Sequence, residues 1–303
     1  MRRVRTGLAV MIAASMGMTL AAQTAGPPPR VLATATGAFV DMDAMVADLA
    51  TADVVFLGEP RARSAGVAGT ELAIVKGLAA KRGPSLVLAL GMFGRDVQEP
   101  FDHFSMGHID DGELEASTGP WSDEQADHQA IIDFVGGRGR PIVASNAASR
   151  LVAEVASSGM AALDAHAADH ALFARDRQCD ASGPEFTRFA ASHAHADGVG
   201  VSPSPSTLSH AYEAACLEDE TIGESIAQAA SVGSSANARP FVVSVNAAAR
   251  SDYRAGAVER THRRLPAARL AVVSFALTDR INDAAAPSDA AARADYVVYV
   301  QQP

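Results

Sequence analysis

The segment DVVFLG at residues 53–58 is an almost unbroken apolar run of strand length. It leaves no polar face, which is typical of a parallel strand that is buried on both sides. Five further runs share these features and alternate with longer stretches of helical periodicity: SLVLAL at 85–90, PIVAS at 141–145, PFVVSV at 240–245, LAVVSF at 270–275 and YVVYV at 296–300. This alternation predicts an α/β fold with a mostly parallel sheet flanked by helices.

The gaps between these runs have helical patterns, at 42–49, 70–81, 96–106, 123–134 and 147–156. Residues 161–230 contain no convincing strand, so we predict a helical insertion between the third and fourth strands. The segment VGVSPSPST at 199–207 is rich in Pro and Ser and predicts a loop that interrupts the insertion.

The first residues are typical of a secretory signal. Arg2, Arg3 and Arg5 precede an apolar stretch at 8–20, which is too short to span a bilayer comfortably. We therefore predict a signal peptide at 1–22, a linker at 23–37 and one α/β domain at 38–303. The protein is then exported to the periplasm or beyond the cell, and no membrane segment remains after cleavage. The alternative is an uncleaved N-terminal anchor.

Charge and cysteine content narrow the possible partners. The formal charge of −10 becomes about −13 once the three arginines of the leader are removed, so nucleic acid is not an expected partner. Cys179 and Cys216 are the only cysteines, and export would place them where disulfides persist. A single bridge between them is the favoured interpretation, and two unrelated buried thiols are the alternative.

Polar groups at the carboxyl ends of the predicted strands are the first place to look for a site, because open parallel sheets bind ligands beyond those ends. The residues at these positions are Gly58, Glu59, Gly91, Asn146 and Asn246.

Five segments, in order and spacing, resemble the ChaN-like haem-binding family: VVFLGE at 54–59, LALGMFGRDVQ at 88–98, residues 119–134, PIVASNAASR at 141–150 and YEAACLEDETIGESIA at 212–227. This family belongs to a superfamily with the Tiki proteases and the erythromycin esterases. The resemblance covers nearly all of the chain after the leader. It implies an exported protein that handles haem or iron, with a Tyr as the axial donor and a homodimer that stacks two haems.

The chain departs from the family pattern at three strand ends. The His that normally follows the first Gly-Glu is absent from 60–63, the Glu before Met-Phe is replaced by Gly91, and the turn at 246–250 lacks its His. Hydrolysis in the superfamily needs such groups to hold a metal or to move a proton. We therefore do not expect an inherited catalytic activity.

The resemblance suggests the cofactor-binding residues. Tyr253 lies in a segment that follows a family motif, Tyr212 is a second possible donor, and His128 stands where the family commonly has a Tyr. Glu59 and Asn146 lie at strand ends. Arginines near strand ends suit haem propionates, and these are Arg61, Arg63 and Arg150. Each of these side chains has an ordinary alternative role as a packed or solvated residue.

Three functional classes follow. The preferred one is a non-catalytic protein that binds haem or another small ligand. A metal-dependent hydrolase would need a substitute metal site, for instance among the histidines at 166, 170, 193, 195 and 210, of which His166 and His170 have the spacing of one helix face. The third is an interaction module that binds no cofactor.

Overall fold

The computed structural model describes residues 27–62, 64–193, 204–232 and 239–302. The predicted signal peptide, Arg63 and His195 therefore lie outside the described residues.

One eight-stranded sheet runs through the molecule, in the order β2-β1-β8-β7-β3-β6-β4-β5. The six strands from β8 to β5 are mutually parallel, whereas β1 pairs antiparallel with both β2 and β8. The bounds are β1 Arg30–Ala33, β2 Ala38–Val40, β3 Val54–Glu59, β4 Leu86–Gly94, β5 Ile142–Asn146, β6 Phe241–Ala247, β7 Leu270–Thr278 and β8 Tyr296–Gln301. The predicted mostly parallel α/β fold is confirmed.

All six predicted strands are present, but the sheet begins earlier in the chain than its apolar runs predict. β1 lies inside the predicted linker, and β2 follows it after a turn at Gly37, whose φ is 68°. These strands have four and three residues, so neither has a recognisable apolar run. Pairing with β8, not local pattern, holds β1 in place.

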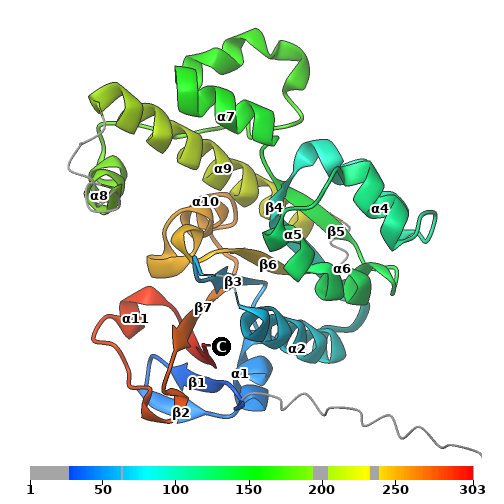
Figure 1. Ribbon diagram of the computed structural model, residues 1–303, viewed down its shortest axis with the longest axis vertical. Coiled ribbons are helices and arrows are strands. Elements are labelled where there is room, and N and C mark those ends of the chain that lie inside the picture. Colours follow the sequence, from blue (N-terminus) through cyan, green and yellow to red (C-terminus); the bar gives the residue numbers. More distant parts are fainter. Residues whose placement is uncertain (1–26, 63, 194–203, 233–238, 303) are drawn as a thin grey trace, which may run out of the picture.

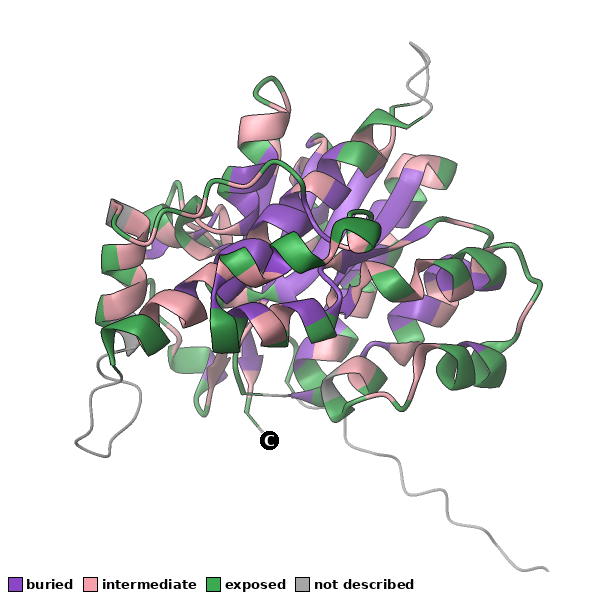
Figure 2. Cartoon of the chain, turned by 90° about the horizontal axis from the view of Figure 1, so that it is seen from above, coloured by how far each residue is buried: buried purple, intermediate pink, exposed green. Residues whose placement is uncertain are grey.

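One face of the sheet is covered by the helices that connect its first strands. Val55 and Leu57 of β3 point to this face, because side chains alternate along a strand. They share a core with residues of α1 (Met42–Leu49), α2 (Ala65–Arg82), α3 (Gln98–Ser105), α4 (Asp111–Thr118) and α6 (Gln129–Gly136). Figure 2 shows this buried centre beneath the exposed outer sides of the helices.

The opposite face carries Val54 and Phe56, which pack against Ile222 and Ile226 of α9 (Pro205–Ser231) and Val258 of α10 (Ala257–Arg264). The second half of α9 therefore belongs to the layer that covers the sheet and is not part of a separate insertion. α9 begins inside the predicted loop at 199–207, because the Ser204 hydroxyl accepts a hydrogen bond from the backbone N–H of Thr207 at the start of the helix.

The first half of α9 packs with α7 (Ser149–Ser158) and α8 (Pro184–His193) at the end of the molecule away from β1 and β2 (Figure 1). A disulfide joins Cys179 to Cys216 of α9. Between β5 and β6, the described residues form only helices and turns. The remaining short helices are α5 (Asp123–Asp127) and α11 (Ala290–Arg293).

Candidate functional site

A cavity of about 580 Å³ lies at the carboxyl ends of β3 and β6. Glu59 ends β3, Ala247 ends β6, and the first turn of α2 closes a third side. The lining residues are Glu59, Pro60, Arg61, Ala62, Ser64, Val67, Ala68, Asp127, His128, Ala247, Ala248 and Ala249. Three of the predicted site residues, Glu59, Arg61 and His128, are thus brought to one place.

His128 contacts two carboxylates beside this cavity. It lies at the junction of α5 and α6, and its side chain is 1% exposed. Its Nε2 is 3.0 Å from Oε1 of Glu59 and 3.6 Å from Oε2 of Glu71, which is fully buried in α2. The end of β3, the helix α2 that follows it and the distant junction of α5 and α6 therefore bring one imidazole and two carboxylates together.

Burial and mutual contact change the titration of this cluster. Burial raises the pKa of Glu71 to about 8, and the nearby charge of Glu59 adds to this, although contact with His128 opposes it. Burial alone would lower the pKa of His128, but its contacts with Glu59 and Glu71 outweigh burial and raise that pKa to about 10. These shifts favour the cationic form of His128 and the protonated form of Glu71.

Tyr253 lies apart from this cavity lining, on a short turn at 252–254 that follows β6. Its side chain is 52% exposed, and its hydroxyl donates a hydrogen bond to Asp289. The Arg293 guanidinium lies 5.8 Å from the centre of the ring. The backbone of Tyr253 has a φ of 60°, a left-handed conformation that non-glycine residues seldom adopt. The surrounding structure therefore holds Tyr253 in a strained backbone conformation.

Tyr212 is instead part of the outer helical packing. It is 5% exposed, and its ring makes edge contacts with Phe186 and Phe189 at centroid distances of 5.4 and 5.5 Å. Its hydroxyl donates to Glu185 at 3.2 Å, and burial raises its pKa to about 12.

Asn146 occupies the end of β5, where it connects two strands to α9. Its Nδ2 donates to the carbonyl of Gly91 at 2.8 Å and to Glu218 at 3.1 Å. Arg250 then pairs with Glu218 and with Asp219, the latter at 2.9 Å. Asn146, Glu218, Asp219 and Arg250 thus all have bonding partners within this network, which fastens α9 to the strand ends.

The chain matches one family of known proteins over most of its length. A family model described as "Haem-binding uptake, Tiki superfamily, ChaN" matches residues 45–260. The chain belongs to the ChaN family.

The fold agrees with this assignment. A solved structure described as "Cofacial heme binding to ChaN of Campylobacter jejuni" matches with a TM-score of 0.67 at 14% identity, covering 90% of this chain and 97% of that one. The structure of the type III effector HopBA1 matches at a TM-score of 0.43 and 11% identity, covering 86% of this chain and 94% of the effector. No curated protein sequence matches the chain.

Gly91 on β4 lies close to the neighbouring strand β6. A Cβ at this position would lie 3.1 Å from Cβ of Asn246 and 3.2 Å from the Val245 carbonyl, which is tighter than ordinary contact. Asn246 is itself held by a hydrogen bond to Ser251 at 3.1 Å. A side chain at position 91 would therefore require β6 to shift by a few tenths of an ångström.

Within the described residues, the paired spacing of His166 and His170 does not produce a metal site. Residues 167–169 form a 3-10 turn, so His166 and His170 do not share an α-helical face as their spacing predicted. His166 pairs with Glu154 at 2.7 Å and with Asp169 at 3.1 Å. No metal-ligand group among the described residues includes these histidines.

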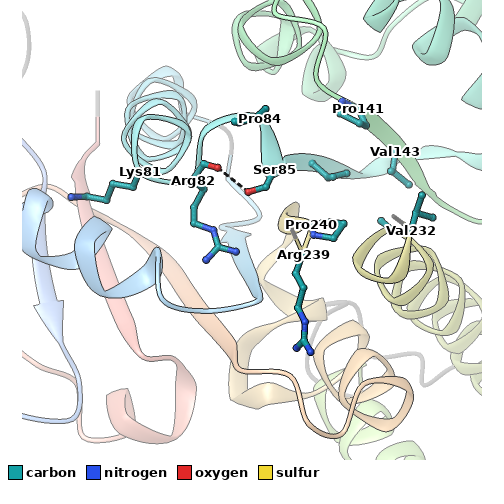
Figure 3. A pocket seen from close by; sticks show the side chains of 11 residues that line it. Lys81, Arg82, Pro84, Ser85, Pro141, Val143, Val232, Arg239 and Pro240 are labelled. Atoms are coloured by element: carbon teal, nitrogen blue, oxygen red, sulfur yellow. Dashed lines mark hydrogen bonds between the residues drawn. The ribbon is translucent and has the colours of Figure 1, made fainter. Parts of the chain in front are cut away.

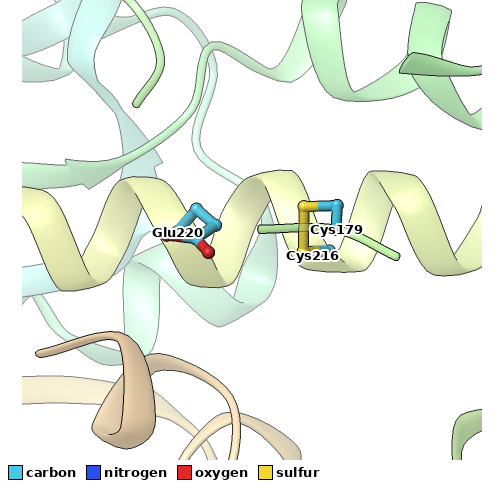
Figure 4. Close-up of side chains that lie close together, drawn as sticks. All are labelled: Cys179, Cys216 and Glu220. Atoms are coloured by element: carbon cyan, nitrogen blue, oxygen red, sulfur yellow. A yellow bond between two sulfur atoms is a disulfide. The ribbon is translucent and has the colours of Figure 1, made fainter. Parts of the chain in front are cut away.

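Two other features are weaker candidates. Cys179, Cys216 and Glu220 lie close enough to share an ion, but the sulfur atoms form a disulfide (Figure 4) and arginines surround Glu220. A larger cavity, about 860 Å³, lies at the amino ends of β4 and β6, where Ser85 and Pro240 line it (Figure 3). That is the end of a parallel sheet opposite to the one where ligands bind.

Glu71 is the site residue that the sequence motifs do not reveal. It falls on the apolar stripe of α2 that is formed by Val67, Ile74, Val75 and Leu78, at the spacing of one helix face. A single carboxylate inside such a stripe is a signal that the sequence already contained.

None of the helices in the described residues is long and apolar enough to cross a membrane.

Proposed function

We propose that this member of the ChaN family is an exported, non-catalytic haem-binding protein in which Tyr253 is the axial donor. The observation that carries the proposal is the half-exposed phenol of Tyr253, held in a strained backbone conformation beside Asp289 and Arg293. Backbone strain of this kind is concentrated at functional sites.

The surroundings of Tyr253 fit a haem iron donor. A phenol must lose its proton to coordinate iron, and Asp289 already accepts that hydrogen bond. Arg293 pairs with Asp289 at 3.5 Å and Arg254 pairs with Asp295 at 2.6 Å, and guanidinium groups of this kind suit haem propionates. Bound haem would supply an iron centre open to one protein ligand.

Burial argues against the other two donors. The imidazole of His128 is engaged with carboxylates, and the Tyr212 hydroxyl is bonded to Glu185 inside the helical region. Tyr253 by itself covers only one side of a flat porphyrin. A homodimer that supplies the other side fits the cofacial haem binding described for ChaN of Campylobacter jejuni.

Haem titration of the purified protein, followed in the Soret region, tests this assignment. We expect a saturable shift at about one haem per chain, and its loss or displacement in Tyr253→Phe. Tyr212→Phe is the matched control, because it removes an equivalent hydroxyl that is buried, and its titration should equal that of the wild type. Size-exclusion chromatography with and without haem measures dimer formation.

A shift that Tyr253→Phe leaves unchanged would remove Tyr253 as the donor. No shift beyond that of free haem would favour an interaction module without cofactor.

Export is tested separately by the N-terminus of the protein recovered from cell fractions. We expect it to begin near residue 23 and to be found in the periplasm or the medium, because a basic start followed by a short apolar stretch directs secretion. Recovery of the intact N-terminus with the membrane would instead indicate a retained anchor.

A further inference from the structure

Within the cluster of Glu59, Glu71 and His128, the buried side chain of Glu71 lacks a hydrogen-bond donor. Neither carboxylate oxygen of Glu71 has a hydrogen-bond partner among the described residues, although the side chain is completely buried. Nε2 of His128 lies 3.6 Å from Oε2 of Glu71, beyond hydrogen-bonding distance, and that nitrogen is closer to Glu59. Buried polar groups are nearly always paired, so an unpaired buried carboxylate points to a missing partner.

The elements that carry the cluster hold it firmly. α2 and α6 pack against each other on the same side of the sheet as Val55 and Leu57 (Figure 1). Glu71 stands between Val67 and Ile74 on the buried side of α2. Its carboxylate therefore cannot turn towards water without breaking the core, and a partner has to come to it.

We propose that Glu59, Glu71 and His128 bind one divalent transition-metal ion of the zinc or manganese type. The three donor atoms lie within 4.8 Å of one another. Tetrahedral ligands at about 2.0–2.2 Å from zinc stand about 3.3–3.6 Å apart. The separations of 3.0 and 3.6 Å from Nε2 of His128 bracket those values, so small side-chain shifts would complete the coordination.

The donor set and the cavity agree with this class of ion. One imidazole and two carboxylates suit zinc, manganese and ferrous iron better than soft metals. Two negative charges beside a divalent cation leave no net charge in the buried site. Glu59 is 16% exposed and lines the cavity with His128, which gives an ion a route in and leaves a coordination position for water.

This site is separate from the proposed haem site, because neither Tyr253 nor its partner Asp289 lines the cavity beside Glu59 and His128. In this site, Glu71 and His128 take the place of the polar strand-end groups that the chain lacks. A failure of haem binding therefore leaves this proposal intact, and the reverse also holds.

Isothermal titration calorimetry with Zn²⁺ and with Mn²⁺, on protein first stripped with a chelator, measures the site directly. We expect one ion per chain in the wild type and an affinity at least about 10-fold weaker in Glu71→Gln. Substitution with Co²⁺ gives a second readout, since its visible absorption bands report coordination and should disappear in the same variant.

Two variants serve as controls. Glu154→Gln alters a carboxylate that also pairs with a histidine, His166, but is partly exposed, and it should bind the ion as the wild type does. Tyr253→Phe should also keep metal binding. If circular dichroism shows that Glu71→Gln is unfolded, Glu59→Gln takes its place.

Binding that Glu71→Gln leaves unchanged would place the ion on surface groups and overturn the proposal. Absence of any stoichiometric binding would overturn it too, and would assign the cluster to a shared proton.

Discussion

Glu71 and Glu220 are both completely buried glutamates on long helices, yet their surroundings are opposite. Glu220 has Arg263 at 2.5 Å, Arg264 at 2.8 Å and Arg260 at 3.0 Å, and accepts a hydrogen bond from the backbone of Gln178 at 3.0 Å. Glu71 has one histidine at 3.6 Å, shared with a second carboxylate.

The same burial therefore has two different consequences. Burial raises the pKa of each carboxyl, but at Glu220 the arginines and the backbone N–H more than offset it, and the pKa falls below its usual value. At Glu71 burial prevails. A satisfied carboxylate stabilises the fold, here next to the disulfide, whereas an unsatisfied one marks a place where a ligand or proton is missing.

The largest effect on stability is expected from neutralising Glu220, the carboxylate that is paired with arginines. Glu220→Gln should lower the free energy of unfolding by about 3–5 kcal/mol, because three buried or half-buried arginines lose their common partner. Urea unfolding followed by circular dichroism measures the change. A loss below about 1 kcal/mol would mean that the arginines find other partners, and the comparison with Glu71 would then fail.

An intermediate effect on stability is expected when acid protonates Glu185, which pairs with Arg260 beside Glu220. Contact with Arg260 lowers the pKa of Glu185 to about 2, although burial opposes this shift. A lowered folded-state pKa gives stability that is present above about 4.5 and is lost as the pH falls through about 2. We expect this contribution to be about 1–2 kcal/mol after allowance for partial exposure.

The measurement is the unfolding free energy of wild type minus that of Glu185→Gln between pH 5 and pH 2. The difference should shrink on acidification, and a difference independent of pH would contradict the assignment.

The smallest effect on stability is expected from substituting Glu71, whose side chain has no hydrogen-bond partner. In metal-free protein at pH 7, Glu71→Gln should change the free energy of unfolding by less than about 1 kcal/mol, because a neutral amide of the same shape replaces a side chain that is already mostly protonated. Thermal unfolding in the presence of a chelator provides the comparison with Glu220→Gln. Equal losses in the two variants would show that both carboxylates serve the fold alike.

Much of the site could be predicted from the sequence, one residue at a time. Glu59 is predicted because it ends a buried strand, and His128 because it lies in a family segment; the structure brings their side chains to 3.0 Å. Their contact could not be predicted, since the residues are 69 positions apart and meet only through the folding of the chain. Asn146 and Tyr212 are predicted by the same kind of argument and lie in other networks.

The sequence by itself determined the fold class and the positions of six strands along the chain, because apolar runs of strand length must be buried between layers of helices wherever they occur. Tertiary structure alone decided that β1 and β2 extend the sheet, that half of α9 covers it, and which buried carboxylate receives three arginines. Burial follows from local pattern, which the chain carries in every segment. The partner of a buried charge depends on distant segments meeting, and only the folded chain brings them together.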